Sequence, residues 1–445
     1  MIQVGTAMVD ITPPIGAQVA GQFHERIAEF VHDPLCARAF VVDDGRTRAA
    51  IVGCDLLSLK RPTVQRARAL AAELTGVPAA NILISATHTH TGPRTTAIFP
   101  SSPDADYVNL LPRQIASAVA AATRARRPAR IGAGSGWEEG ATHNRRFLTA
   151  DGEVRTHPPK GAPGFLGPEG PDDPEVGVLF AEDEQARFVG AVVAYTSHPI
   201  VVGHEKAFSA DFPGSACRTL EAIKGAPGSV TFVNGAYANV CPFDVCNAGR
   251  REYGYVWAER FGHMVAGEAL RVLEKTDTLA DAPVRVASRR VELTLRGIDD
   301  EVIASARQLL AAPADQPPPG ATDRGSAHRE RTYANEVVLL AEERRLSPTV
   351  EAEVQVVAIG PAAFVGIPAE LFVEFGLEIK RRSPWLFTYI VGGANGMVGY
   401  VPTRRAFRGG GYETRLARSS KLTAEAGEIL VEAAVGLLKQ VHGRG

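Results

Sequence analysis

The sequence predicts an α/β fold in which mixed β-sheets are flanked by helices within a single large domain. Short apolar runs that end at polar or Gly-Pro turns alternate with longer segments of helical periodicity. Polar landmarks follow several of the expected strands and come from all parts of the chain. Because α/β enzymes gather their catalytic groups at strand ends, a site assembled from such distant segments favours one domain over residues 1–445.

The first half of the chain supplies the clearest elements. Residues 9–16 are expected to form a short strand that runs into a proline turn, and residues 36–43 and 48–55 a pair of strands around a polar turn. A helix at 62–74 leads into a strand at 81–85, and strand–helix–strand is the crossover pattern of a parallel sheet. We further expect a helix at about 110–125, strands at 176–180 and 188–195, a helix opening at 209–214, and a strand at 230–234.

The second half contains two insertions in this pattern. The Pro- and Gly-rich segment 157–174 is interpreted as an ordered lid or insertion, because strands resume directly after it. Residues 299–346 are expected to form two helices that are broken by the proline run 316–320. The other expected elements are helices at about 256–274 and 423–441, strands at 284–295 and 386–391, and a hairpin of 351–360 with 362–367.

Composition excludes several classes of function. The formal net charge is −2, so the sequence carries no electrostatic signal for binding nucleic acid or an anionic membrane. The N-terminus lacks the features of a signal peptide, and no apolar run approaches the ~18 residues of a membrane span. Five scattered cysteines do not suggest a disulfide framework. We therefore expect a cytoplasmic protein without integral membrane association that acts on a small molecule, and the oligomeric state stays open.

The segment Thr87-His-Thr-His-Thr-Gly-Pro93 is the strongest local signal. In a strand, residues two apart share a face, so His88 and His90 would point the same way. Imidazoles are the commonest metal ligands and the commonest acid/base groups near neutral pH, although two histidines bonded to the backbone would be an alternative. No Gly-x-Ser-x-Gly, phosphate-loop or His-Glu-x-x-His motif is present, which disfavours a serine α/β-hydrolase, a nucleotide enzyme and a zincin.

His198 at a second strand end and Glu370 after Ile367-Pro-Ala extend this pattern. Together these residues resemble the catalytic, amino-terminal domain of the neutral, non-lysosomal ceramidases and their smaller bacterial relatives, which carry the motif Thr-His-Thr-His-(Ser/Thr)-Gly-Pro. The resemblance implies a Zn²⁺ site formed by His88, His198, Glu370 and Tyr400. It also implies that His90 lies beside the reacting carbonyl.

The resemblance assigns further roles and shows departures. Tyr412 would help to hold the oxyanion, and Arg145 matches an Asn-Arg pair that contacts the site. Cys241 stands where the larger ceramidases have a serine proposed as nucleophile, so it is a candidate nucleophile or a buried packing residue. Asp211 is either a helix N-cap or a residue that orients a ligand histidine. The resemblance covers the amino-terminal domain, so we expect no counterpart of the β-sandwich domain that follows in those enzymes.

Two imidazoles, a carboxylate and a tyrosine suit Zn²⁺, which lowers the pKa of bound water from 15.7 towards roughly 7. We therefore expect a zinc-dependent hydrolase that cleaves an amide (N-acyl) bond of a small soluble substrate. A zinc-dependent esterase or lactonase on the same site is one alternative, and a non-catalytic metal-dependent binding protein is another. The small substrate is expected because segment 157–174, placed near the site, carries Lys160, Glu169, Asp172 and Asp173.

Overall fold

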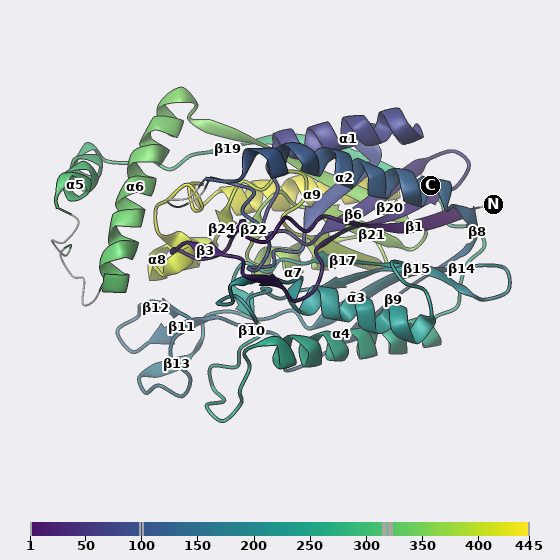
Figure 1. The fold of residues 1–445 in the computed structure, drawn as a ribbon, viewed down its shortest axis with the longest axis horizontal. Coiled ribbons are helices and arrows are strands. Elements are labelled where there is room, and N and C mark those ends of the chain that lie inside the picture. The colour runs from purple at the N-terminus through teal and green to yellow at the C-terminus, as the bar shows by residue number, and fades with distance from the viewer. Residues whose placement is uncertain (1, 98, 100–101, 314–317, 319–323, 444–445) are drawn as a thin grey trace.

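Three β-sheets that share one central core form the body of the molecule. The computed structural model describes residues 2–97, 99, 102–313, 318 and 324–443. The inner faces of the sheets contribute Phe40, Leu179 and Phe364, among others, to a common apolar cluster. Helices cover the outer faces, and Figure 1 shows α1 and α2 along the top and α3 and α4 along the bottom. The predicted mixed α/β fold with flanking helices is confirmed.

The first sheet has the strand order β7-β6-β5-β1-β8. Strands β6 and β7 are parallel and are joined through α1, as the sequence predicts, while the other pairs are antiparallel. The predicted strand at 9–16 is displaced, because the strand that pairs with β5 ends at Asp10, before Pro13 and Pro14, which have no N–H to donate. The strands are β1 (Gln3–Asp10), β5 (Cys36–Asp43), β6 (Arg48–Cys54), β7 (Ile82–Ala86) and β8 (Arg127–Pro128), and the covering helices are α1 (Arg61–Thr75) and α2 (Ala105–Arg124).

The second sheet has the order β17-β15-β14-β9 and, like the first, contains one parallel pair among antiparallel pairs. Its parallel pair, β15 and β17, is connected through α3, and α4 packs beside α3 over the same face. The strands are β9 (Arg130–Trp137), β14 (Glu175–Glu182), β15 (Phe188–Tyr195) and β17 (Val230–Asn234), and the helices are α3 (Asp211–Lys224) and α4 (Tyr255–Lys275).

The third sheet has the order β19-β20-β21-β23, with β21 and β23 parallel and joined through α7. Helices α5 and α6 are inserted between the antiparallel strands β19 and β20, and Figure 1 shows them projecting at the left end of the molecule. The predicted break at 316–320 lies largely outside the described residues. The elements are β19 (Val284–Thr294), α5 (Asp300–Ala311), α6 (Arg324–Leu346), β20 (Thr349–Ile359), β21 (Ala362–Gly366), α7 (Val373–Arg382), β23 (Phe387–Val391) and α9 (Ala426–His442).

Segment 157–174 contains a strand, β13, that completes a small three-stranded sheet. Three of its charged side chains are held in ion pairs, Lys160 with Glu252, Glu169 with Arg146 and Asp173 with Lys380. The remaining elements are the short pairs β2 (Gln18–Val19) with β3 (Arg26–Ile27), β4 (Phe30–Val31) with β16 (Ala207–Phe208), β10 (His143–Asn144) with β18 (Val240–Cys241) and β22 (Glu370–Leu371) with β24 (Tyr400–Val401), the three-stranded sheet β12 (Val154–Thr156), β11 (Arg146–Thr149) and β13 (Phe165–Pro168), helix α8 (Arg404–Gly409), and the 3₁₀ turns η1 (Ala79–Asn81) and η2 (Tyr412–Thr414).

The carboxyl ends of the parallel strands meet at one place. Asn234, the last residue of β17, donates from Nδ2 to the carbonyls of Thr87 and Ser197, which follow β7 and β15. Its own carbonyl accepts from the N–H of Gly392, directly after β23. One buried asparagine therefore ties the ends of all three sheets together, and the polar residues that follow these strands are brought to a common point.

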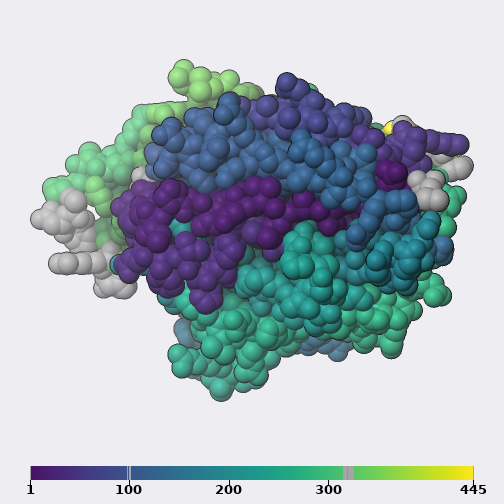
Figure 2. All heavy atoms as spheres, turned by 45° about the vertical axis from the view of Figure 1, so that its right-hand side comes forward, coloured from purple at the N-terminus to yellow at the C-terminus, as the bar shows by residue number. Residues whose placement is uncertain are grey.

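The N-terminal part of the chain lies on the surface between two helical layers. Figure 2 shows it as a purple belt between the blue helix α2 and the teal region of α3 and α4. Within the described part of the chain, none of the helices combines the length and the apolar character needed to cross a membrane.

Candidate active site

Three histidines converge at the strand ends. His88 and His90 follow β7, and His198 follows β15 in the neighbouring sheet. The Nε2 atom of His198 lies 3.1 Å from Nε2 of His88 and 3.1 Å from Nε2 of His90. His88 and His90 do share a direction, but not through strand alternation: β7 ends at Ala86, and His88 has a φ of 72°. This left-handed conformation costs about 1–3 kcal/mol, and the N–H of His88 is held by the carbonyl of Leu56.

The remaining ring nitrogens determine what this cluster can bind. Nδ1 of His88 lies 2.7 Å from the carbonyl oxygen of Leu57, Nδ1 of His90 lies 3.0 Å from that of Gly21, and Nδ1 of His198 lies 3.2 Å from that of Tyr237. A carbonyl can only accept, so we assign the proton of each neutral ring to Nδ1. Nη1 of Arg145, which lies 3.3 Å from Nδ1 of His198, then forms no hydrogen bond to that ring.

Each Nε2 then carries a lone pair, and three lone pairs facing one another cannot form hydrogen bonds among themselves. Burial lowers the pKa values of His90 and His198 well below the usual range, with nearby positive groups adding to the effect, which keeps these two rings neutral. The ligand atoms of the three rings lie within 4.8 Å of one another and therefore fit a metal ion, so His88, His90 and His198 could hold one.

Glu370 adds a carboxylate to the cluster. Its Oε2 atom lies 3.4 Å from Nε2 of His88 and, although buried, has no hydrogen-bond partner in the protein. An unpaired buried carboxylate oxygen is costly, and a cation between it and the histidines would remove that cost. Glu370 and Tyr400 are direct neighbours in the parallel register of β22 and β24, so they approach the histidines from the same small sheet.

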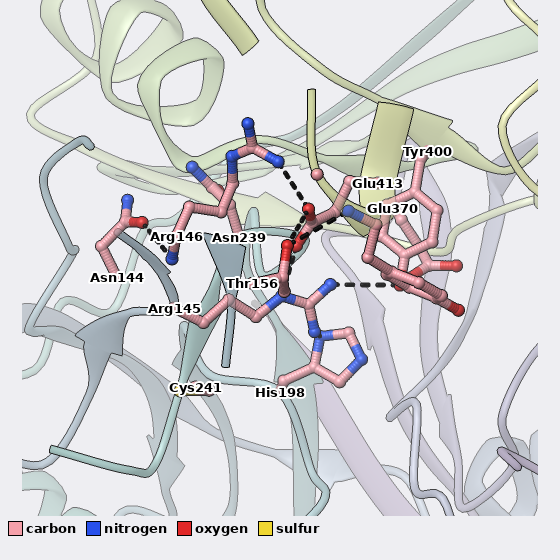
Figure 3. Close-up of polar contacts among 12 residues, drawn as sticks. Asn144, Arg145, Arg146, Thr156, His198, Asn239, Cys241, Glu370, Tyr400 and Glu413 are labelled. Carbon is pink, nitrogen blue, oxygen red and sulfur yellow. Dashed lines mark hydrogen bonds and ion pairs between the residues drawn. The ribbon is translucent and has the colours of Figure 1, made fainter. Parts of the chain in front are cut away.

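Tyr400 is buried next to Arg145. Its hydroxyl accepts a hydrogen bond of 3.2 Å from Nη2 of Arg145, which Figure 3 shows as a dashed line. Burial and the charge of Glu370 raise the pKa of Tyr400 well above its usual range, while Arg145 opposes this shift. The hydrogen bond from Arg145 leaves the remaining lone pair of the phenol oxygen available.

A small cavity of about 60 Å³ lies above the histidines. Its polar walls include His88, His90, Glu370 and Arg94, and Tyr412 closes one side with its ring nearly perpendicular to that of Tyr400. The residues that line it are Ala20, Gly21, Leu57, Ser58, His88, His90, Arg94, Thr96, Phe99, Glu370, Met397, Tyr400, Tyr412 and Ser419.

Solved structures with this architecture were found by comparison. A ceramidase complexed with C2 matches with a TM-score of 0.73 at 19% sequence identity over 100% of this chain and 75% of the other. The neutral ceramidase from Pseudomonas aeruginosa matches with a TM-score of 0.73 at 19% identity over 99% of this chain and 75% of the other. The chain has the neutral ceramidase fold. No family model matches the sequence, and neither does any curated protein.

The ceramidase resemblance predicted from the motifs is therefore confirmed at the level of the fold. The structure brings together all four proposed metal ligands, and it places His90 with them rather than apart. Segment 157–174, which the sequence placed beside the site as a polar wall, does not contribute to the cavity lining. That expectation is wrong because the segment packs as β13 against β11 instead.

Two other candidate residues lie behind the cavity rather than on its wall. Arg145 is 3% exposed and contacts Tyr400, His198 and Glu413. Cys241 is fully buried in β18, where its thiol contacts the carbonyl of Phe243. Burial raises the pKa of Cys241 to about 12, which disfavours the thiolate that a nucleophile needs.

The residues that orient the histidines differ from those expected. Asp211 does not face a ligand: its carboxylate accepts hydrogen bonds from the N–H groups of Phe212 and Val202. Backbone carbonyls orient the rings instead, and these carry no sequence signature. Glu413 was not identified from the sequence. Its position directly after Tyr412 in a glycine-rich turn was the signal that could have indicated a partner for Arg145.

Proposed function

We propose that this chain is a zinc-dependent hydrolase that cleaves the amide bond of a small soluble N-acyl compound. The observation that carries the proposal is the convergence of the Nε2 atoms of His88 and His198 with the unpaired carboxylate oxygen of Glu370 beside a cavity, with Nε2 of His90 next to them as a proton acceptor. Nitrogen and oxygen donors of this kind suit Zn²⁺. We propose His88, His198, Glu370 and Tyr400 as the ligands and residues 1–445 as one metallohydrolase domain.

Zinc held by these residues would supply a water of lowered pKa and a Lewis acid for the substrate carbonyl. The chain itself supplies the proton transfers. Because Nδ1 of His90 donates to Gly21, its Nε2 accepts a proton from the attacking water and later returns it to the leaving amine. Tyr412 lines the same cavity, and its hydroxyl is the donor that we assign to the developing oxyanion. Arg145 does not line the cavity and acts by donating a hydrogen bond to the hydroxyl of Tyr400.

A cluster of aromatic rings around Phe23 and Phe99, which we call the roof of the cavity, favours the proposal of a small substrate. Phe23 packs against Phe99, Tyr333 and Tyr412, with ring centroids 4.6, 5.6 and 6.1 Å away. Helix α6 holds this roof in place through a hydrogen bond between the ring of His328 and the carbonyl of Phe23. A cavity of about 60 Å³ is far below the roughly 300–1,000 Å³ of pockets for drug-sized ligands. We therefore propose that ceramide, with two long chains, is a poor substrate.

A substrate panel on zinc-loaded protein tests the function. Short N-acyl amines and N-acyl amino acids should be hydrolysed faster than the corresponding esters and lactones, and faster than ceramide in detergent micelles. Faster ester or lactone cleavage would favour the esterase alternative, and no turnover at all would favour a metal-dependent binding protein. Efficient ceramide cleavage with inert short amides would refute the small substrate. Full activity in metal-free protein would refute the zinc dependence.

A further inference from the structure

Arg145 contacts three groups with three different nitrogens. Nε donates to Oε1 of Glu413 at 2.8 Å and Nη2 donates to the hydroxyl of Tyr400 at 3.2 Å, while Nη1 lies 3.3 Å from the protonated Nδ1 of His198 without a hydrogen bond to it. Figure 3 shows the guanidinium between Glu413 and Tyr400. The orientation of this planar group therefore determines where its positive charge lies relative to two of the proposed zinc ligands.

Glu413 is positioned to set that orientation. Its side chain is fully buried, and its second oxygen, Oε2, accepts from Nη1 of Arg146 at 2.6 Å and from the hydroxyl of Thr156 at 2.8 Å. Burial alone would raise the pKa of Glu413, but the charges of Arg145 and Arg146 outweigh it and hold the pKa below its usual range. The carboxylate is thus ionised and held from two sides.

The two arginines do not depend on Glu413 equally. Arg146 has a second carboxylate partner, because its Nε donates to Glu169 at 2.5 Å. Among the residues that the structure describes, Glu413 is the one carboxylate that forms an ion pair with Arg145. Removing its charge would leave Arg145 buried without a compensating anion and free to rotate towards Glu370 and the histidines.

We propose that Glu413 is a positioning residue of the site: its carboxylate holds Arg145 so that the guanidinium faces Tyr400 and His198 from behind. This inference rests on the proposed function, because Tyr400 and His198 matter there as zinc ligands. Residues that orient metal ligands from outside typically change metal affinity or activity by 10–100-fold when they are replaced. Glu413 touches neither substrate nor metal, so its effect passes through Arg145.

Zinc affinity measured by competition with a chelator tests this without relying on turnover. Glu413→Gln keeps the shape of the side chain and is expected to weaken zinc binding by about 10–100-fold. The matched control is Glu353→Gln, which neutralises another buried carboxylate, on β20 of the third sheet and paired with Arg68 of helix α1. Both variants should lose thermal stability, but only Glu413→Gln should lose zinc affinity. Equal zinc affinities in the two variants would overturn the inference.

A double-mutant cycle separates positioning from general packing. In an Arg145→Gln background, Glu413→Gln should change zinc affinity by less than about threefold, because its route to the ligands is already gone. Additive losses would overturn the inference. Should Glu413→Gln fail to fold, Thr156→Val removes one hydrogen bond to the same carboxylate and should lower zinc affinity in the same direction; unchanged affinity would count against the inference. A wild-type protein that binds no zinc would instead refute the proposed function.

Discussion

At the scale of single residues, the proton on Nδ1 of each histidine determines the chemistry of the cluster. The carbonyls of Leu57, Gly21 and Tyr237 each accept from one ring and leave three Nε2 lone pairs facing inward. A ring in the other tautomer, with its proton on Nε2, would present a donor instead and could not bind a metal. Backbone geometry, rather than an acidic partner, therefore sets the metal-binding state of these side chains.

The first prediction concerns His88. Wild-type protein should contain about one zinc per chain, and His88→Ala should lose most of it together with nearly all activity, because its Nε2 lies between Glu370 and His198. Elemental analysis measures the zinc. His204→Ala, at an exposed position, is the control and should keep both properties. Zinc retained in His88→Ala would contradict the assignment.

The second prediction tests whether His90 is a zinc ligand or an acid/base residue. If it acts on protons, as proposed, His90→Ala should keep its zinc and lose about 10²–10⁴-fold in kcat. His198→Ala should lose the metal as well, since its ring stands between the other two. Zinc content and steady-state kinetics of the two variants are compared side by side. A His90→Ala protein without zinc would make His90 a third histidine ligand.

Cys241 should prove to be a packing residue. Its raised thiol pKa and complete burial predict that Cys241→Ala keeps most of the activity. Alkylation gives a second measurement: Cys246 is the exposed cysteine and should react first, so the experiment uses a Cys246→Ala background. Inactivation of that background by iodoacetamide, with zinc retained, would restore Cys241 as a nucleophile.

At the scale of elements, the α5–α6 insertion shapes the cavity by supporting loops from elsewhere. Glu336 on α6 accepts from the N–H of Phe99, and Tyr333 on the same helix packs against Phe23. Both phenylalanines lie outside the helices and strands. Under the proposed function, this insertion between two neighbouring strands would therefore limit the size of the substrate by holding the roof in place.

Phe99 is the roof residue that tests this arrangement. Phe99→Ala removes a wall of the cavity and should shift the ratio of kcat/KM for longer over shorter acyl groups by about tenfold or more, since one methylene is worth about 10–200-fold in a fitted pocket. Phe165→Ala, a half-buried aromatic in segment 157–174, is the matched control and should leave the ratio unchanged. An unchanged ratio in Phe99→Ala would remove the roof as the limit on substrate size.

At the scale of the whole molecule, the proposed ligands come from all three layers. His88 follows the first sheet, His198 follows the second, and Glu370 follows β21 of the third. A metal ion held by all three would link layers that otherwise meet through the shared apolar core and through Asn234. The site and the global stability of the fold should therefore be coupled.

Zinc should accordingly raise the thermal midpoint. Ligand at 1,000 times its Kd stabilises a protein by about 4.1 kcal/mol, so chelation should lower the midpoint by several degrees and added zinc should restore it. Calorimetry with and without a chelator measures the difference. The midpoint of His88→Ala should not respond to zinc, and a response equal to that of wild type would show that zinc stabilises the protein at another place.

Sequence alone was sufficient for most of the elements and for most of the chemistry-bearing residues. Apolar runs of strand length and amphipathic segments predicted most strands and helices of the three sheets, because burial on one face is a local requirement, but they missed β9 and α7 and displaced β1. The histidine motif, His198 and Glu370 were found as residues that follow strands. The cytoplasmic location remains a prediction from the sequence.

Only the tertiary structure decided how these residues act together. The structure alone showed the positive φ of His88. It also showed the carbonyls that orient the histidine rings and the ion pair between Arg145 and Glu413, which are contacts between residues 31 to 268 positions apart in the sequence. The polar wall expected from segment 157–174 failed for the same reason, since composition does not show which face a loop presents. Local patterns report what each segment must bury. Contacts between distant segments depend on how the three sheets pack, and no local pattern encodes that packing.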